Sequence, residues 1–553
     1  MDDYYDLGSY SCPVTTPSAQ AQLWFDRGLN WTYGYNHEEA VECFTTALTH
    51  DPGCAMAYWG IAYASGPNYN MPWDLFDEAG RAKALAAAYD ATQAALALAV
   101  AMSPVEQALI AALPARYPQR DLGSDMHAWN HEFADAMRAA FALHPDHLDL
   151  RTVYAESLLN LSPWKMWDLP SGFPAEGAAT TETQQVLEAA LNAAPGAMIH
   201  PGLLHLYIHL MEMSPTPEKA LKAGDALRGL VPDAGHLVHM PTHIDVLCGH
   251  YQNVVQWNQK AVEADLRYYK RKGAYNIYTG YRQHDYHFTI YGALFLGQIQ
   301  PALDAVQGMF DTVPEEMLRI SSPPMADYFE SYMAMGPHIL IRFGRWEEAI
   351  ALTPPKDQKV YCTLTATTHY ARAVAFAATG RVAEAEAEEQ VFLAARDRVP
   401  DTRLLHNNKV VDLFDIATEM LRGEIEYRKG NYDAAYAHLR ASVAHDDSLP
   451  YDEPWGWMQP TRHALGALLL EQGHVAEAEV VYREDLGLGG QLSRATVHPD
   501  NVWSLKGLHD CLKTRGEVVE IVQIKQRLDL ALARADKAVG ASCFCAQAAM
   551  RAG

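Results

Sequence analysis

The chain has 553 residues, of which 49% are hydrophobic, so it can bury a large core and is too long for one compact globule. Asp and Glu number 68 against 43 Lys and Arg, and the resulting net charge of −25 disfavours nucleic acid as a partner. No run approaches the roughly 20 apolar residues of a membrane span. The acidic start MDDYYDLGSY lacks a basic-then-apolar signal, so we expect a cytoplasmic protein that does not bind membranes.

Helix is predicted along the whole chain. The alanine-rich segment 81–102 has high helix propensity, and no convincing run of alternating strand residues occurs. Short breaks rich in Pro and Gly separate segments of about 12–18 residues, which is an ordinary helix length. The sequence therefore predicts the all-α class.

A turn pattern recurs between these segments. It consists of Gly, a variable residue, an aromatic or aliphatic residue, two variable residues and a small residue. Each Gly is predicted to end the first helix of a pair, and the residues after it to begin the second. The pattern begins at Gly34, Gly249, Gly297, Gly344, Gly380, Gly430, Gly473 and Gly516.

Residues 25–64 resemble a tetratricopeptide repeat. The family's conserved positions are filled by Gly28, Ala40, Phe44, Ala47 and Pro52. The phrases NHEEA, HLYIH and HMPTH, within roughly residues 25–380, also resemble a subgroup of large tetratricopeptide-repeat chains for which the resemblance implies no particular activity. It does imply a right-handed α–α superhelix of antiparallel helix pairs, because one such pair cannot bury its apolar face alone.

The predicted domain organisation follows from these patterns. Residues 1–20 form an N-terminal extension, residues 21–535 form one continuous array of repeats, and residues 536–553 form a C-terminal tail. The eight cysteines are scattered, and buried free thiols are the expected state. Cys543 and Cys545 could instead bind a metal or oxidise, although nothing nearby completes a zinc-finger spacing.

Two histidine pairs stand one repeat apart. His205 and His209 precede His239 and His243 by 34 residues each, which is the length of a tetratricopeptide repeat. Stacked repeats would place the four imidazoles on one face. His205 and His209 are an i, i+4 pair and so share one side of a helix. Pro241 belongs in a first helical turn, so we expect His239 at the cap, just before the helix that carries His243.

The resemblance extends this set, because tetratricopeptide repeats bind ligands through fixed positions of the first helix of each pair. Histidine fills these positions in three consecutive repeats. A lone helical histidine is usually a packing residue, but a cluster in register needs a compensating partner such as a metal. The predicted metal ligands are His205, His209, His239, His243 and His287. The predicted second-shell or substrate-binding residues are His236, His284, His338, Tyr207, Asn160 and Trp164, and the catalytic candidates are Glu212, Glu156 and Tyr291.

A set dominated by imidazoles suits copper, iron, zinc or nickel and disfavours calcium and magnesium. The number of histidines exceeds one tetrahedral zinc site, so it fits either one metal with further supporting histidines or two metals. Copper or iron is the preferred cofactor, with zinc as the alternative. No phosphate loop or dinucleotide motif occurs, so no nucleotide cofactor is expected.

We therefore predict a metal-dependent copper or non-haem iron oxidase or oxygenase that acts on a small organic substrate in the groove centred on residues 200–340. The first alternative is a tetratricopeptide scaffold that binds a protein or peptide without catalysis. The second is a zinc-dependent hydrolase or lyase. The sequence leaves open whether the chain forms a homo-oligomer.

Overall fold

The computed structural model describes residues 4–123 and 125–546. The chain divides into two compact units. Unit 1 comprises residues 1–244 and 260–282, and unit 2 comprises residues 245–259 and 283–553. Three helices contribute residues to both units, namely α12 (Pro241–Leu247), α13 (Tyr251–Lys272) and α14 (Tyr278–Leu296).

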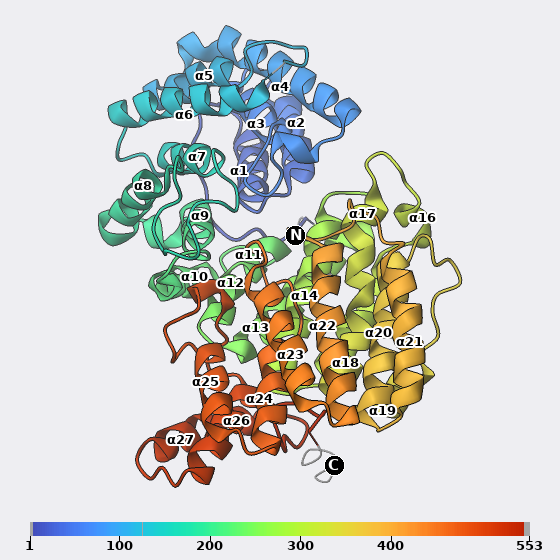
Figure 1. The fold of residues 1–553 in the computed structure, drawn as a ribbon. Coiled ribbons are helices and arrows are strands. Elements are labelled where there is room, and N and C mark those ends of the chain that lie inside the picture. The colour runs from blue at the N-terminus through green and yellow to red at the C-terminus, as the bar shows by residue number, and fades with distance from the viewer. Residues whose placement is uncertain (1–3, 124, 547–553) are drawn as a thin grey trace. The chain divides into compact units, whose positions relative to one another are not determined.

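Unit 1 contains eleven further α-helices within the described residues (Figure 1). They are α1 (Ala19–Tyr33), α2 (His37–His50), α3 (Ala55–Ser65), α4 (Glu78–Leu98), α5 (Pro104–Arg116), α6 (Met126–Leu143), α7 (Leu148–Leu159), α8 (Thr180–Ala193), α9 (Pro201–Met211), α10 (Leu221–Leu227) and α11 (Gly235–His239). Its short 3₁₀ helices are η1 (Trp73–Leu75), η2 (Ala99–Ala101), η3 (Ala197–Ile199) and η4 (Pro217–Ala220).

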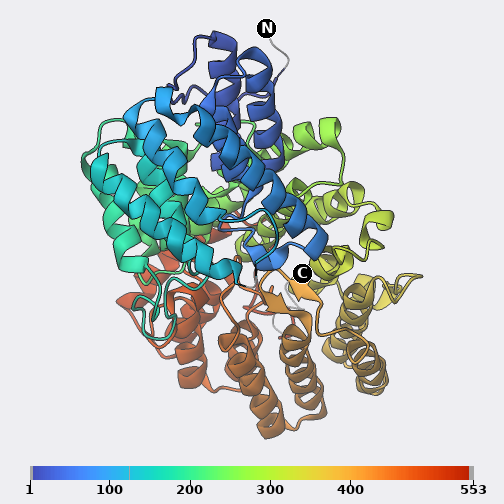
Figure 2. The same ribbon diagram turned by 90° about the horizontal axis from the view of Figure 1, so that it is seen from above.

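Unit 2 contains the remaining helices. They are α15 (Gln300–Thr312), α16 (Glu315–Leu318), α17 (Met325–Phe329), α18 (Met335–Arg342), α19 (Trp346–Ala351), α20 (Cys362–Ala378), α21 (Val382–Arg396), α22 (Val410–Lys429), α23 (Tyr432–Asp447), α24 (Thr461–Glu471), α25 (Val475–Asp485), α26 (Val502–Thr514) and α27 (Glu520–Leu532), with η5 (Glu330–Ala334) and η6 (Arg494–Thr496). The helices from α18 to α24 lie side by side (Figures 1 and 2).

Consecutive helices pack as antiparallel pairs joined by short turns, as in α20–α21 and α22–α23, so the predicted all-α, tetratricopeptide-like class is confirmed. One element was not predicted. A two-stranded antiparallel hairpin, β1 (Leu404–Leu405) and β2 (Asn408–Lys409), is the only sheet within the described residues. Strands of two residues are too short to produce a recognisable alternation in the sequence.

Seven of the eight turn glycines adopt the left-handed backbone conformation that favours this residue. Their φ angles lie between 61° at Gly344 and 82° at Gly430. The first turn differs, because Gly34 has φ −91° and the next residue, Tyr35, has φ 54°. A bulky side chain is thus held in the conformation that glycine usually takes, which strains the backbone locally.

Phe44 of α2 shows how the repeat pattern packs. Its ring is fully buried and lies between Gly28 of α1 and Gly60 of α3. A Cβ atom at either glycine would come within 2.6 Å of the ring. The family position occupied by Gly28 therefore needs glycine for close packing between helices rather than for backbone freedom.

The predicted helix 81–102 corresponds to α4 and η2. Among the described residues, Glu78–Ala101 is the one segment long and apolar enough to cross a membrane, and 28% of its most apolar window is buried. Helix α4 contacts both α3 and α5, as the helices of neighbouring repeats do. A core helix of a soluble protein can have the same length and composition, so the cytoplasmic location stays a prediction.

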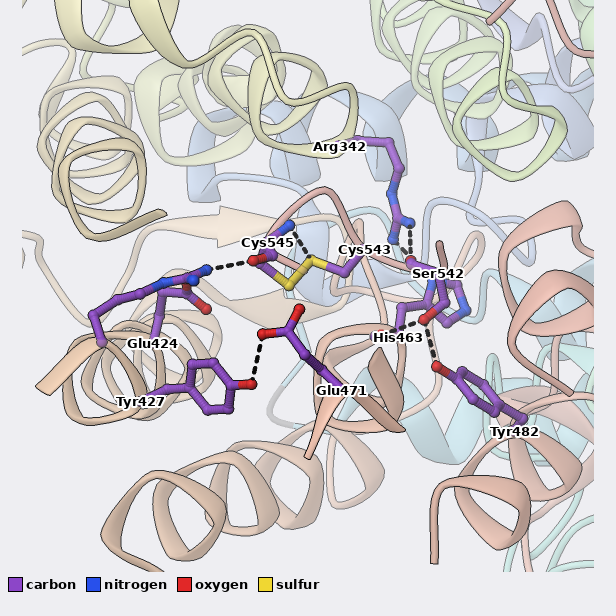
Figure 3. Close-up of a disulfide and its surroundings, with 10 residues drawn as sticks. Arg342, Glu424, Tyr427, His463, Glu471, Tyr482, Ser542, Cys543 and Cys545 are labelled. Atoms are coloured by element: carbon purple, nitrogen blue, oxygen red, sulfur yellow. Dashed lines mark hydrogen bonds and ion pairs between the residues drawn. A yellow bond between two sulfur atoms is a disulfide. The ribbon is translucent and has the colours of Figure 1, made fainter. Parts of the chain in front are cut away.

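The cysteines follow the expectation of free thiols at six positions. The two others, Cys543 and Cys545, form a disulfide, so the alternative of oxidation applies to them (Figure 3). The described part of the predicted tail is anchored on unit 2 beside this bond. The carbonyl of Ser542 accepts a hydrogen bond from Arg342, and that of Cys545 accepts one from Arg428.

We expect Gly28→Ala to lower the free energy of unfolding by about 1–3 kcal/mol, because the new methyl group overlaps the ring of Phe44. Gly336→Ala in α18 is the matched control. Its Cβ would meet only Val306, at 3.6 Å, so it should leave stability unchanged or raise it by less than about 1 kcal/mol. Urea unfolding measures both variants, and equal values for the two would contradict the packing argument.

Candidate metal centre

Five imidazoles of unit 1 come from three helices. His205 and His209 lie on α9, His236 and His239 on α11, and His243 on α12. Their exposed fractions lie between 0 and 2%. Every residue of α9 is buried, so this helix has no solvent-facing side on which its two histidines could point away from the others.

Two prolines shape these helices. Pro201 occupies the first turn of α9, where a missing N–H costs nothing, and His200 caps the helix by accepting a hydrogen bond from the N–H of Leu203. Pro241 begins α12, so α11 ends at His239 and a new helix starts two residues later. The structure thus places His239 at a helix end, before the helix of His243, as the sequence analysis expected.

The imidazoles face one another through their Nε2 atoms. Nε2 of His205 lies 3.1 Å from Nε2 of His236, and Nε2 of His239 lies 2.6 Å from Nε2 of His243. One ligand atom from each of His205, His209 and His236 lies within 4.8 Å of the other two. Metal–imidazole bonds of about 2.0–2.1 Å place such atoms at comparable separations, so the donor set fits one ion.

The other ring nitrogens are engaged by oxygen acceptors. The carboxylate of Glu212, at the C-cap of α9, accepts from Nδ1 of His209 at 2.9 Å and from Nδ1 of His243 at 2.7 Å. Nδ1 of His205 donates to the carbonyl oxygen of Tyr33 at 2.7 Å. With the proton on Nδ1, these three rings present the Nε2 lone pair, which is the arrangement that second-shell acceptors produce in metal sites.

The protonation state suits ligation. Burial lowers the pKa of His205 and His236 well below the ordinary value, and the neighbouring histidines lower it further. Both imidazoles are therefore neutral near pH 7, and neutral imidazole is the form that binds metal ions. Nδ1 of His236 has no hydrogen-bond partner within the described part of the chain.

Tyr35 packs against this group and was not predicted from the sequence. Its ring centroid lies 4.6 Å from that of His205, 5.5 Å from that of His236 and 5.8 Å from that of His209. Burial raises the pKa of its phenol well above the usual value. The only hint in the sequence is its place after the turn glycine Gly34, and the left-handed backbone that directs it inward is not visible there.

Glu156, a catalytic candidate, lies beside the same group. It accepts a hydrogen bond from Tyr63, and burial raises the pKa of its carboxyl group against the opposing effects of Tyr63, Arg116, Tyr35 and His209. Glu156 thus accepts from a tyrosine, whereas Glu212 accepts from two imidazoles.

The other candidates in unit 1 divide into two groups. Trp164 packs against Tyr69 at 5.4 Å, and Tyr69 in turn lies 4.6 Å from His209. Asn160 caps α7, where its N–H donates to the carbonyl of Glu156. Tyr207 instead donates its hydroxyl to Glu188 of α8.

The remaining candidates lie in unit 2. Tyr291 pairs with Nε2 of His498 at 2.9 Å, and Nε2 of His287 lies 3.0 Å from the sulfur of Met458. The ring of His284 stacks on that of His406, and the ring of His338 meets that of Trp457 edge to face. The roles predicted for His284, His287, Tyr291 and His338 stay predictions. The sequence analysis did not identify their neighbours His406 and Met458.

No protein-family model and no curated protein matches the chain. Similar solved structures include the TPR domain of P58(IPK), with 14% identity, a TM-score of 0.21 and coverage of 82% of this chain and 99% of that chain. They also include the APC/C hetero-tetramer Cut9–Hcn1, with 12% identity, a TM-score of 0.25 and coverage of 96% and 95% respectively.

A third structure, Naa15/Naa10 bound to HypK-THB, has 11% identity, a TM-score of 0.22 and coverage of 96% of this chain and 74% of that chain. Values this low carry no argument about function. The class defined by the structure itself is an all-α protein of tetratricopeptide-like helix pairs with a buried histidine cluster.

Because burial opposes protonation of histidine, we predict that the free energy of unfolding depends on pH. A variant of His338 tests this prediction. Burial lowers the pKa of His338 to about 4. The unfolded chain takes up a proton on this side chain below pH 6.5 while the folded chain does not, so the free energy of unfolding falls as pH falls. We expect His338→Gln to reduce this dependence by up to about 1.4 kcal/mol per pH unit between pH 6 and pH 4.5.

His127→Gln is the control, because the side chain of His127 is 59% exposed. It should leave the pH dependence of unfolding unchanged. Guanidinium unfolding at several pH values measures the slope for each variant and for the original protein. A slope that His338→Gln does not alter would show that His338 is protonated in the folded state.

Proposed function

We propose that unit 1 binds a transition-metal ion through His205, His209 and His236. One observation carries this proposal: ligand nitrogens of three buried imidazoles lie within 4.8 Å of one another. His239 and His243 would serve a second ion or support the first. Buried polar groups need a partner, and imidazole lone pairs that face one another do not satisfy each other. A metal ion accepts lone pairs from several imidazoles at once.

The donor set favours particular metals. The three proposed ligands are all nitrogens, and the nearest carboxylate, Glu212, already accepts hydrogen bonds from the Nδ1 atoms of His209 and His243. Copper, iron, zinc and nickel accept such a set, whereas calcium and magnesium require oxygen ligands. We propose copper or iron as the resident ion.

The finer part of the proposal is an oxidase or oxygenase that acts on a small organic substrate. A bound copper or iron ion would supply one-electron chemistry with dioxygen. The residues of the chain would orient the ligands and cover the site. Glu212 holds two imidazoles in the ligating tautomer, and Tyr35 and Tyr69 cover the rings and exclude water. Burial raises the pKa of Glu156, the candidate for proton transfer.

A second function, a scaffold that binds a protein partner, is favoured by the fold. Consecutive antiparallel helix pairs such as α20–α21 and α22–α23 are the arrangement that tetratricopeptide repeats use to bind proteins. This function does not conflict with metal binding. The remaining alternative is a zinc-dependent hydrolase or lyase. The identity of the bound metal distinguishes it from an oxidase or oxygenase, because a zinc ion would favour hydrolase or lyase chemistry over oxidation.

His209→Ala should abolish one metal equivalent while preserving the helical circular dichroism signal. The variant removes a ligand that no other described residue replaces at the same place. The protein and the variant are dialysed against Cu(II), Fe(II) under anaerobic conditions, or Zn(II), and the bound metal is measured by elemental analysis. His131→Ala, an exposed histidine of α6, is the control and should keep full metal content.

Less than about half an equivalent of each metal in the unaltered protein, or equal content in the His209 and His131 variants, would contradict the proposal. Electron paramagnetic resonance of the Cu(II) form adds an independent readout. Nitrogen hyperfine coupling from imidazoles is expected in the original protein and should be weakened or lost in His209→Ala.

Glu212→Gln should weaken metal binding in unit 1 by about 10- to 100-fold. The amide keeps the shape of the side chain but offers one oxygen acceptor, so it cannot accept from Nδ1 of both His209 and His243. Glu188→Gln is the matched control, since that carboxylate accepts from Tyr207 and Gln184 and not from an imidazole among the contacts described. Competition with a chelator of known affinity measures the change, and equal affinities for the two variants would exclude a positioning role for Glu212.

A further inference from the structure

Unit 2 contains a separate group of potential metal ligands. One ligand atom from each of His284, His406 and Glu453 lies within 4.8 Å of the other two. His284 lies on α14, His406 in the hairpin between β1 and β2, and Glu453 in the segment between α23 and α24. Three segments distant in sequence thus converge on one point, which hydrophobic packing alone does not require of polar side chains.

His406 is held by its backbone and by its ring. It occupies the turn between β1 and β2 with φ 52°, a conformation rare for residues with a side chain. Nδ1 of the ring forms a hydrogen bond with the carboxylate of Asp452. That carboxylate also accepts from the amide nitrogen of Asn408 at 2.8 Å and from the N–H of Glu453 at 3.0 Å. Asp452 therefore fixes the imidazole so that Nε2 is the atom presented to a ligand.

The other two members are also placed by their neighbours. The rings of His284 and His406 are nearly parallel, with an interplanar angle of 16° and centroids 5.0 Å apart. Tyr451 donates its hydroxyl to Oε2 of Glu453 at 3.0 Å. His284 and Glu453 are 6% and 5% exposed, whereas the side chain of His406 is 21% exposed. Two members of the group are therefore buried, and His406 is partly exposed.

A further polar side chain lies next to this group. His287 follows His284 by one turn of α14 and is 1% exposed, and its Nδ1 has no hydrogen-bond partner among the described residues. Its Nε2 lies 3.0 Å from the sulfur of Met458. Burial, together with the nearby imidazole of His406, lowers the pKa of His287 to about 3, so the ring is neutral.

We propose that His284, His406 and Glu453 bind a divalent first-row transition ion, with Fe(II) as the preferred ion. Two imidazoles and one carboxylate form the donor set that non-haem Fe(II) sites use, and this set leaves coordination positions open to other ligands. Asp452 is the positioning residue, since it touches the ligand His406 and not the metal. All three proposed ligands belong to unit 2.

The experiment uses the full chain carrying His205→Ala and His209→Ala, which removes two of the three proposed ligands of the unit 1 ion. Anaerobic titration with Co(II), a spectroscopic substitute for Fe(II), is followed by visible absorption and by equilibrium dialysis with elemental analysis. We expect one equivalent per chain with d–d bands of a mixed nitrogen and oxygen environment. Direct titration with Fe(II) should give the same stoichiometry.

Two ligand variants are then compared with a matched control. His406→Asn removes the imidazole but keeps a residue that tolerates the left-handed conformation, so the turn is retained. Glu453→Gln removes the carboxylate charge. Each should weaken Co(II) binding at least tenfold, and Asp452→Asn should weaken it by about 10- to 100-fold. His438→Ala, which removes an imidazole paired with Glu419 in α22, should leave affinity unchanged.

Circular dichroism and thermal unfolding establish that each variant is folded, and the Glu453 variant keeps the test valid if the His406 variant is not. No bound Co(II), or equal affinity in His406→Asn, Glu453→Gln and His438→Ala, would overturn the proposal. Failure of the unit 1 proposal leaves this result unaffected, because the bound Co(II) is assigned to unit 2 by its loss in His406→Asn and Glu453→Gln.

Discussion

The carboxylate of Glu212 and its two imidazole donors are the constraint on which the candidate site of unit 1 depends. Buried histidines cannot all be charged, because desolvation opposes the imidazolium and each charge repels the next. They must stay neutral, and each neutral ring then has one donor and one acceptor to satisfy. Glu212 and the carbonyl of Tyr33 take three of the Nδ1 protons, so the Nε2 lone pairs are turned toward one another.

This hydrogen-bond arrangement depends on the sequence of α9, α11 and α12. The helix α9 supplies two rings one turn apart, and Glu212 caps its end within reach of His209. Pro241 divides what would otherwise be one helix, which lets α11 end at His239 and α12 begin just before His243. Across this break the ring planes of His239 and His243 stand at 83° to each other.

The sequence predicted the parts that depend on spacing. The all-α class, the helix pairs and the turn glycines follow from periodicity, and the pairing of His205 with His209 follows from an i, i+4 interval. Tyr35 could not be predicted, because its place depends on a left-handed backbone where Gly34 was expected to take that conformation. His406 and Glu453 could not be predicted either, since their approach to His284 depends on a two-residue hairpin and on contacts between distant segments.

In both units a carboxylate forms a hydrogen bond with Nδ1 of a histidine in the candidate metal site. In unit 1 a carboxylate, Glu212, backs two imidazoles whose Nε2 atoms face other nitrogens, and in unit 2 Asp452 backs His406, whose neighbour in the ligand group is the carboxylate of Glu453. A backing acceptor raises the basicity of the ring and fixes its tautomer, whatever else the ring meets. The composition of the facing group then sets the preference of each site: nitrogen alone suits copper, whereas mixed nitrogen and oxygen suits ferrous iron. Under the two proposals, a difference in metal preference between the units would follow from their facing donors and not from their backing carboxylates.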